Sequence, residues 1–164
     1  MENILEDEQR LRINTVSKSI LLMCVVALVY AVFAKLFLIF ATANGNVSFV
    51  YPSSGIALAA LLLYGRQIWP AIFIGSLIES LWVSDPAWVA ILIATGNTLS
   101  SVIALHLLKQ RNFDTTLSKL QDVYTLTIFG GALSSVTAAV IGVGVLTVAG
   151  IVDGDKFITS LFTW

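Results

Sequence analysis

The feature that most restricts the fold is a series of long apolar segments separated by short polar links. The first segment, residues 19–42, contains one charged side chain, Lys35. A transmembrane helix needs about 20 predominantly apolar residues, so this segment is long enough to cross a bilayer. Four more such segments and the start of a sixth follow, at 49–64, 67–83, 87–108, 123–152 and 157–164. We therefore predict an all-α, polytopic transmembrane helical bundle with five full spans and the beginning of a sixth.

The composition agrees with this prediction. Hydrophobic residues make up 57% of the 164 residues and charged residues 12%, and the mean hydropathy is +0.90. A soluble domain of this length could not bury so much apolar surface, because small domains bury only part of the surface that the unfolded chain exposes. The apolar side chains must face lipid, so the bilayer is the first expected partner. The net charge of −1 indicates no basic surface for a nucleic acid.

The later segments carry three further expectations. We expect the polar residues 109–122 to contain a short surface helix. The fifth segment is long and rich in glycine, so we expect it to be tilted or bent. The last segment is too short to span a bilayer. We interpret it as the start of a helix in a longer chain, and the alternative is an interfacial helix anchored by Trp164.

The distribution of lysine and arginine predicts the orientation of the bundle. Seven of the nine basic residues precede the first segment or lie in the links after the second and fourth, whereas one lies in the opposite set of links. Cytoplasmic loops are enriched in these residues. We therefore predict a cytoplasmic N-terminal segment at 1–18 and a membrane-embedded domain at 19–164 that is incomplete at its C-terminal end. The seven residues are Arg10, Arg12, Lys18, Arg66, Lys109, Arg111 and Lys119.

This orientation brings several polar groups to the outer half of the membrane, where we predict a ligand site. An ionisable group in hydrocarbon is costly and normally faces the bundle interior, so Lys35 and Glu79 are candidates for an ion pair. The serine hydroxyls and amides at the start of the second segment can bind an anionic group, because a helix N-terminus carries a partial positive charge. The predicted site consists of Lys35, Pro52, Ser53, Ser54, Gly55, Glu79 and Asn97.

Each of these residues also has a structural interpretation. The long side chain of Lys35 can extend to the outer headgroups, and Glu79 can be hydrated near the interface. The group from Pro52 to Gly55 can serve as a helix cap and a close-packing surface. Asn97 can form a hydrogen bond between two helices.

The sequence contains no phosphate-binding loop, no His-Glu-x-x-His motif and no set resembling a catalytic triad. We therefore expect no enzymatic activity, no metal site and no cofactor in this chain. Small residues at four-residue spacing, such as Gly96 with Ser100, allow helices to approach closely. These faces leave room for a homodimer as a further partner.

The stretch YPSSGIALAALLLYGRQIWPAIFIGS, residues 51–76, resembles the signature of the first family of bacterial membrane-associated sensor domains (MASE, type one). The stretches TGNTL, residues 95–99, and LQDVYTL, residues 120–126, are similar to two further motifs of that family. The matching positions of the first stretch are Pro52, Gly55, Ile56, Ala57, Ala59, Gly65, Arg66, Trp69, Pro70 and Gly75.

The resemblance implies a multi-pass sensory module in the bacterial inner membrane. In that family the module is fused to a cytoplasmic output, either a diguanylate cyclase, with or without a phosphodiesterase domain, or a histidine kinase. The expected function is therefore signal input for cyclic-di-GMP or two-component signalling, with a small-molecule or membrane-borne cue. The alternative is a small transporter or a substrate-binding membrane subunit, because such proteins also build sites from broken helices beside buried charges.

Overall fold

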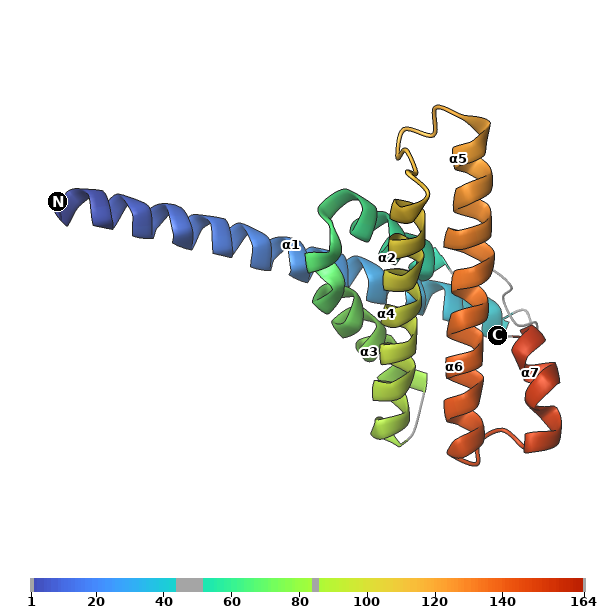
Figure 1. Ribbon diagram of the computed structural model, residues 1–164. Coiled ribbons are helices and arrows are strands. Elements are labelled where there is room, and N and C mark those ends of the chain that lie inside the picture. The colour runs from blue at the N-terminus through green and yellow to red at the C-terminus, as the bar shows by residue number, and fades with distance from the viewer. Residues whose placement is uncertain (1, 44–51, 84–85, 164) are drawn as a thin grey trace.

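The computed structural model describes residues 2–43, 52–83 and 86–163, and every regular element in these ranges is a helix (Figure 1). The all-α prediction is therefore confirmed for the described chain. In order, the helices are α1 (Glu2–Ala43), α2 (Pro52–Tyr64), the 3₁₀ turn η1 (Arg66–Ile68), α3 (Trp69–Val83), α4 (Ala87–Gln110), α5 (Leu120–Thr125), the π-helical η2 (Leu126–Leu133), α6 (Ser134–Val148), the 3₁₀ turn η3 (Gly154–Lys156) and α7 (Phe157–Thr163).

Three of these helical stretches are long and apolar enough to cross a membrane: Val16–Phe37 within α1, Ala87–Gln110, and Leu120–Val148. Helices α2 and α3 have 13 and 15 residues, which is less than the roughly 20 residues of a full span. The helical structure is interrupted between them at Gly65, whose φ of +83° lies in the left-handed region that favours glycine. Three of the predicted spans thus have the required length.

The polar N-terminal residues continue the first membrane helix without a break. Helix α1 has 42 residues, and its N-terminal half extends away from the other helices in Figure 1. The apolar part of α1 packs on α2 and α3. The N-terminal half is therefore a helical extension of the apolar stretch Val16–Phe37.

One buried apolar cluster joins four of the helices. It combines residues from the early apolar part of α1, the second half of α2, the start of α3 and the end of α4. Leu126 and Phe129 of η2 pack against the same cluster. Its members are Val26, Ala27, Tyr30, Ala57, Leu58, Ala60, Leu61, Ile68, Ala71, Ile72, Ala104, Leu105 and Leu108.

Helices α1 and α3 approach each other closely at Gly75. A Cβ atom at this position would lie 2.9 Å from the Ala27 carbonyl oxygen and 2.9 Å from the Tyr30 Cβ. Neither of these atoms is at the end of a flexible side chain. Gly75 therefore sets the distance between the two helices.

The predicted surface helix within 109–122 is wrong. Helix α4 continues to Gln110, and residues 111–119 then form turns until α5 begins at Leu120. Carboxylates satisfy the backbone of these turns: Asp114 Oδ1 accepts from the Thr116 amide at 2.9 Å, and Asp122 Oδ2 accepts from the Lys119 amide at 3.1 Å. Hydrogen bonds from the Thr116 amide and hydroxyl lower the pKa of Asp114. These local bonds compete with helix formation.

The fifth predicted segment forms one continuous helical stretch, α5–η2–α6, over Leu120–Val148. Eight of its residues, Leu126–Leu133, are π-helical and not α-helical. The expected tilt or bend of this segment stays a prediction. After α6, Gly150 adopts a φ of +71° and the chain turns back, so that α7 packs on α6. The proposed anchor Trp164 lies outside the described residues.

Candidate functional site

The first predicted site residues form the start of α2. Ser53 is completely buried, with 0% of its surface exposed, and its Oγ has no hydrogen-bond partner among the described residues. Ser54 and Gly55 are exposed, and an added Cβ at Gly55 would meet no atom within 4 Å. A buried hydroxyl without a partner costs about 1–3 kcal/mol. The start of α2 therefore contains one unsatisfied buried polar atom at Ser53, and Gly55, two residues further along, faces open space.

A second predicted residue, Asn97, connects α4 to α3. Asn97 Nδ2 donates to the Oγ of Ser76 at 3.0 Å, and Ser76 is completely buried. The backbone carbonyl of Asn97 accepts hydrogen bonds from the hydroxyls of Ser100 at 2.9 Å and Ser101 at 3.0 Å. This is the bond between helices that the structural interpretation of Asn97 predicts. A role in ligand binding stays a prediction.

The two predicted charges lie towards the C-terminal ends of α1 and α3. Lys35 Nζ is positioned 4.9 Å from the centroid of the Trp82 ring, a cation–π contact between the two helices. Glu79 is partly buried and precedes Trp82 by three residues, which is almost one helical turn. The ion pair between Lys35 and Glu79 stays a prediction, because the contact that the structure defines for the ammonium group is with Trp82.

These contacts connect parts of the predicted site in pairs. Lys35 joins the end of α1 to the end of α3, and Asn97 joins α3 to α4. The start of α2 contributes Ser53, and α2 packs on both α1 and α4. The structure therefore relates the predicted residues through the packing of four helices.

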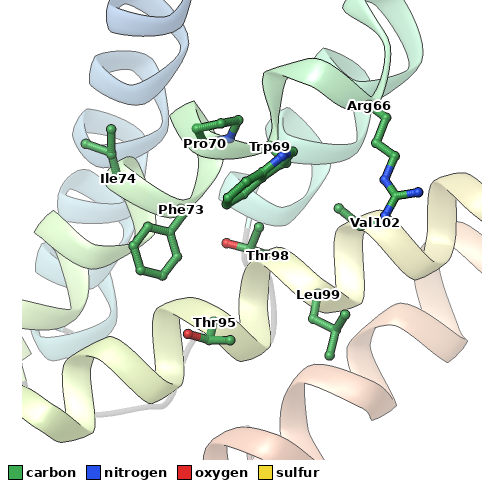
Figure 2. Close-up of a pocket in the computed structure, with 9 residues that line it drawn as sticks. All are labelled: Arg66, Trp69, Pro70, Phe73, Ile74, Thr95, Thr98, Leu99 and Val102. Atoms are coloured by element: carbon green, nitrogen blue, oxygen red, sulfur yellow. The ribbon is translucent and has the colours of Figure 1, made fainter.

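A groove between α3 and α4 was not among the predicted sites. Its volume is about 540 Å³, and its walls come from Arg66 of η1, from α3 and from one face of α4 (Figure 2). Arg66, Trp69 and Pro70 belong to the motif that carries the family resemblance, but the sequence did not indicate that they face a groove. The spacing of Thr95, Leu99 and Val102 on α4 could have indicated a shared face, since residues four and three apart are neighbours on a helix. The lining residues are Arg66, Trp69, Pro70, Phe73, Ile74, Thr95, Thr98, Leu99 and Val102.

The described side chains offer no obvious place for a metal ion. Within residues 16–37, 52–83 and 86–162, no three His, Cys, Asp or Glu side chains are grouped to hold one. The predicted site offers hydroxyls, an amide and the charged side chains of Lys35 and Glu79. Such groups can bind and orient a ligand.

The MASE1 family model matches residues 22–164, which is most of the chain. The chain belongs to the MASE1 family. MASE1 is a family of membrane-associated sensory domains without catalytic activity of their own. The resemblance seen in the three sequence motifs is thus confirmed, and a membrane-associated sensory domain agrees with the long apolar helices of the structure. No curated protein and no solved structure matches the chain.

Proposed function

We propose that this MASE1 domain is the input module of a signalling protein in the bacterial inner membrane. In this proposal the N-terminus is cytoplasmic, and the signal passes to a cytoplasmic diguanylate cyclase, phosphodiesterase or histidine kinase outside this chain. Membership of a sensory family supports the function. The bias of basic residues supports the orientation.

We further propose that the cue binds at the start of α2. The observation that carries this assignment is the buried Ser53 hydroxyl without a partner. In the interior of a membrane domain such a group has little access to water, so a polar atom of the cue would relieve the cost of its burial. The first turn of α2 adds the positive end of a helix dipole, which favours an anionic or strongly electronegative group on the cue. Lys35, Glu79 and Asn97 are the further candidates for this site.

The signal then consists of a change in packing between α2 and its neighbours. A cue shifts an equilibrium only if it binds one packing more tightly than the other. Ser53 lies at one end of α2, and Leu58 and Leu61 of the same helix belong to the apolar cluster shared with α1, α3 and α4. A displacement of α2 at Ser53 therefore changes contacts with all three of these helices.

The proposed orientation can be tested by cysteine labelling. In a Cys24→Ser background, Lys119→Cys and Asp155→Cys would be exposed to a membrane-impermeant maleimide in spheroplasts. Both side chains are exposed in the structure. We expect labelling of position 155 in intact spheroplasts, and labelling of position 119 only after the membrane is permeabilised. The opposite pattern would invert the orientation and remove the cue site from the outer half.

The proposed cue site can be tested without knowing the cue. In the complete protein with its cytoplasmic output, Ser53→Leu places apolar bulk where the cue would bind, and we expect it to change the basal output. Ser135→Leu, at an exposed position of α6, is the matched control and should leave the output unchanged. Size-exclusion chromatography checks that both variants fold. If a folded Ser53→Leu protein has the wild-type output, the start of α2 does not take part in signalling.

A further inference from the structure

The groove between α3 and α4 has a chemistry that differs from that of the proposed cue site. Most of its lining residues are apolar, and Arg66 is the one charged residue among them. Figure 2 shows Arg66 at one end, with the Trp69 side chain between it and Phe73. The groove thus has an apolar body and a cationic end.

The two threonines of the groove add little polarity. Thr95 Oγ1 donates to the Ile91 carbonyl at 2.8 Å, and Thr98 Oγ1 donates to the Ala94 carbonyl at 2.8 Å. Both hydroxyl protons are therefore committed to α4 itself. A polar ligand would gain no hydrogen bond from these protons, whereas a hydrocarbon chain needs none. The body of the groove is suited to an acyl chain.

The cationic end selects the kind of lipid. Arg66 is exposed and carries a permanent charge, and the planar guanidinium group matches the geometry of a phosphate with two parallel hydrogen bonds. Trp69 is 47% exposed beside it, and tryptophan is enriched where hydrocarbon meets the headgroups. A phosphodiester at Arg66 would thus have its acyl chain running past Trp69 into the groove.

We propose that this groove binds one acyl chain of an anionic phospholipid, such as phosphatidylglycerol, with the lipid phosphate at Arg66. The volume of about 540 Å³ is within the usual range of small-ligand sites, about 300–1,000 Å³. The positive charge of Arg66, which lines the groove, attracts a negatively charged headgroup. Charge complementarity therefore favours an anionic lipid over a zwitterionic one.

Fluorescence quenching of Trp69 tests the proposal directly. The full chain, with Trp82, Trp88 and Trp164 replaced by Phe, would be placed in nanodiscs of phosphatidylglycerol and phosphatidylcholine, with brominated acyl chains on one lipid at a time. We expect brominated phosphatidylglycerol to quench more efficiently. The preference should be about five-fold, which is what one basic residue near anionic lipid supplies. Circular dichroism checks that the single-tryptophan chain keeps its helices.

Three variants and one competitor complete the test. Arg66→Gln should abolish the preference between the lipids, whereas Lys109→Gln, at a basic residue that does not line the groove, should keep it. Val102→Phe fills the groove and should reduce quenching by both lipids. Equal quenching by the two lipids in the parent chain, or equal effects of Arg66→Gln and Lys109→Gln, would overturn the proposal. Loss of the preference on adding inorganic phosphate would also overturn it, because Arg66 would then bind a free anion.

Discussion

Two serines offer a direct test of the proposed cue site, because both are completely buried and they differ in their hydrogen bonding. Ser76 Oγ accepts from Asn97 Nδ2 at 3.0 Å, whereas Ser53 Oγ has no partner among the described residues. Ser53→Ala removes a buried polar atom whose desolvation costs about 1–3 kcal/mol. We therefore expect Ser53→Ala to be at least as stable as the wild type, and any gain in stability should not exceed this cost of about 1–3 kcal/mol.

Ser76→Ala should have the opposite effect. It leaves the Asn97 amide without its acceptor, and hydrogen bonds between membrane helices contribute about 0.6 kcal/mol on average and at most about 1.7 kcal/mol. We expect Ser76→Ala to lower the free energy of unfolding by an amount in this range.

The assay is reversible unfolding in mixed micelles, followed by circular dichroism, for the wild type and the two variants in the absence of any added cue. The prediction concerns the sign of the difference between the variants. If Ser53→Ala is destabilised as much as Ser76→Ala, the Ser53 hydroxyl is already satisfied in the free protein. The start of α2 would then offer no unsatisfied hydroxyl for a cue to bind.

Three further predictions concern the packing and charges. Gly75→Ala introduces a Cβ 2.9 Å from the Ala27 carbonyl oxygen and the Tyr30 Cβ of α1, so it should destabilise the bundle by about 1–3 kcal/mol in the same unfolding assay. Gly144→Ala is the control, because an added Cβ there meets no atom within 4 Å, and it should be neutral or slightly stabilising. Equal effects of the two variants would contradict the close approach at Gly75. The pKa of Asp114 lies below its ordinary value of 3.8, so the stability that this carboxylate gives to the 111–119 turns is fully present above pH 3.8 and is lost as the pH falls through the lower folded-state pKa. At neutral pH, the backbone amides of these turns should therefore exchange hydrogen faster in Asp114→Ala than in the wild type. Unchanged hydrogen exchange would refute the capping role. Lys35→Ala and Glu79→Ala, measured singly and together, should give less-than-additive losses of stability if the two side chains form the predicted ion pair; strictly additive losses would exclude it.

The sequence predicted the helical class and most element positions because hydrophobic segments and helix-breaking residues are local signals. The end of α2 at Gly65 is one example, since its positive φ is a local requirement. The surface helix within 109–122 was mispredicted because composition does not reveal which carboxylates accept backbone amides, as Asp114 and Asp122 do. The composition of residues 109–122 favours a helix, but the hydrogen bonds to these carboxylates stabilise turns instead.

The site was less predictable than the fold, because it depends on which faces of the helices meet. Asn97 was identified as a polar group within a membrane helix, but its partner Ser76 lies 21 residues away in the sequence and on another helix. The groove escaped prediction for a similar reason: Arg66 and Leu99 line one cavity only after α3 and α4 have packed together. Pairing between helices is thus the information that a single sequence lacked.

The uninterrupted length of α1 has a mechanical consequence. It approaches α3 closely at Ala27, opposite Gly75, and the helix extends from there back to Glu2. The 25 residues between Glu2 and Ala27 span about 38 Å at about 1.5 Å per residue, so a rotation of about 5° at that contact moves the tip by about 3 Å. A helix that rotates as one body about this contact converts a sub-ångström adjustment between α1 and α3 into a displacement that is several times larger at its far end.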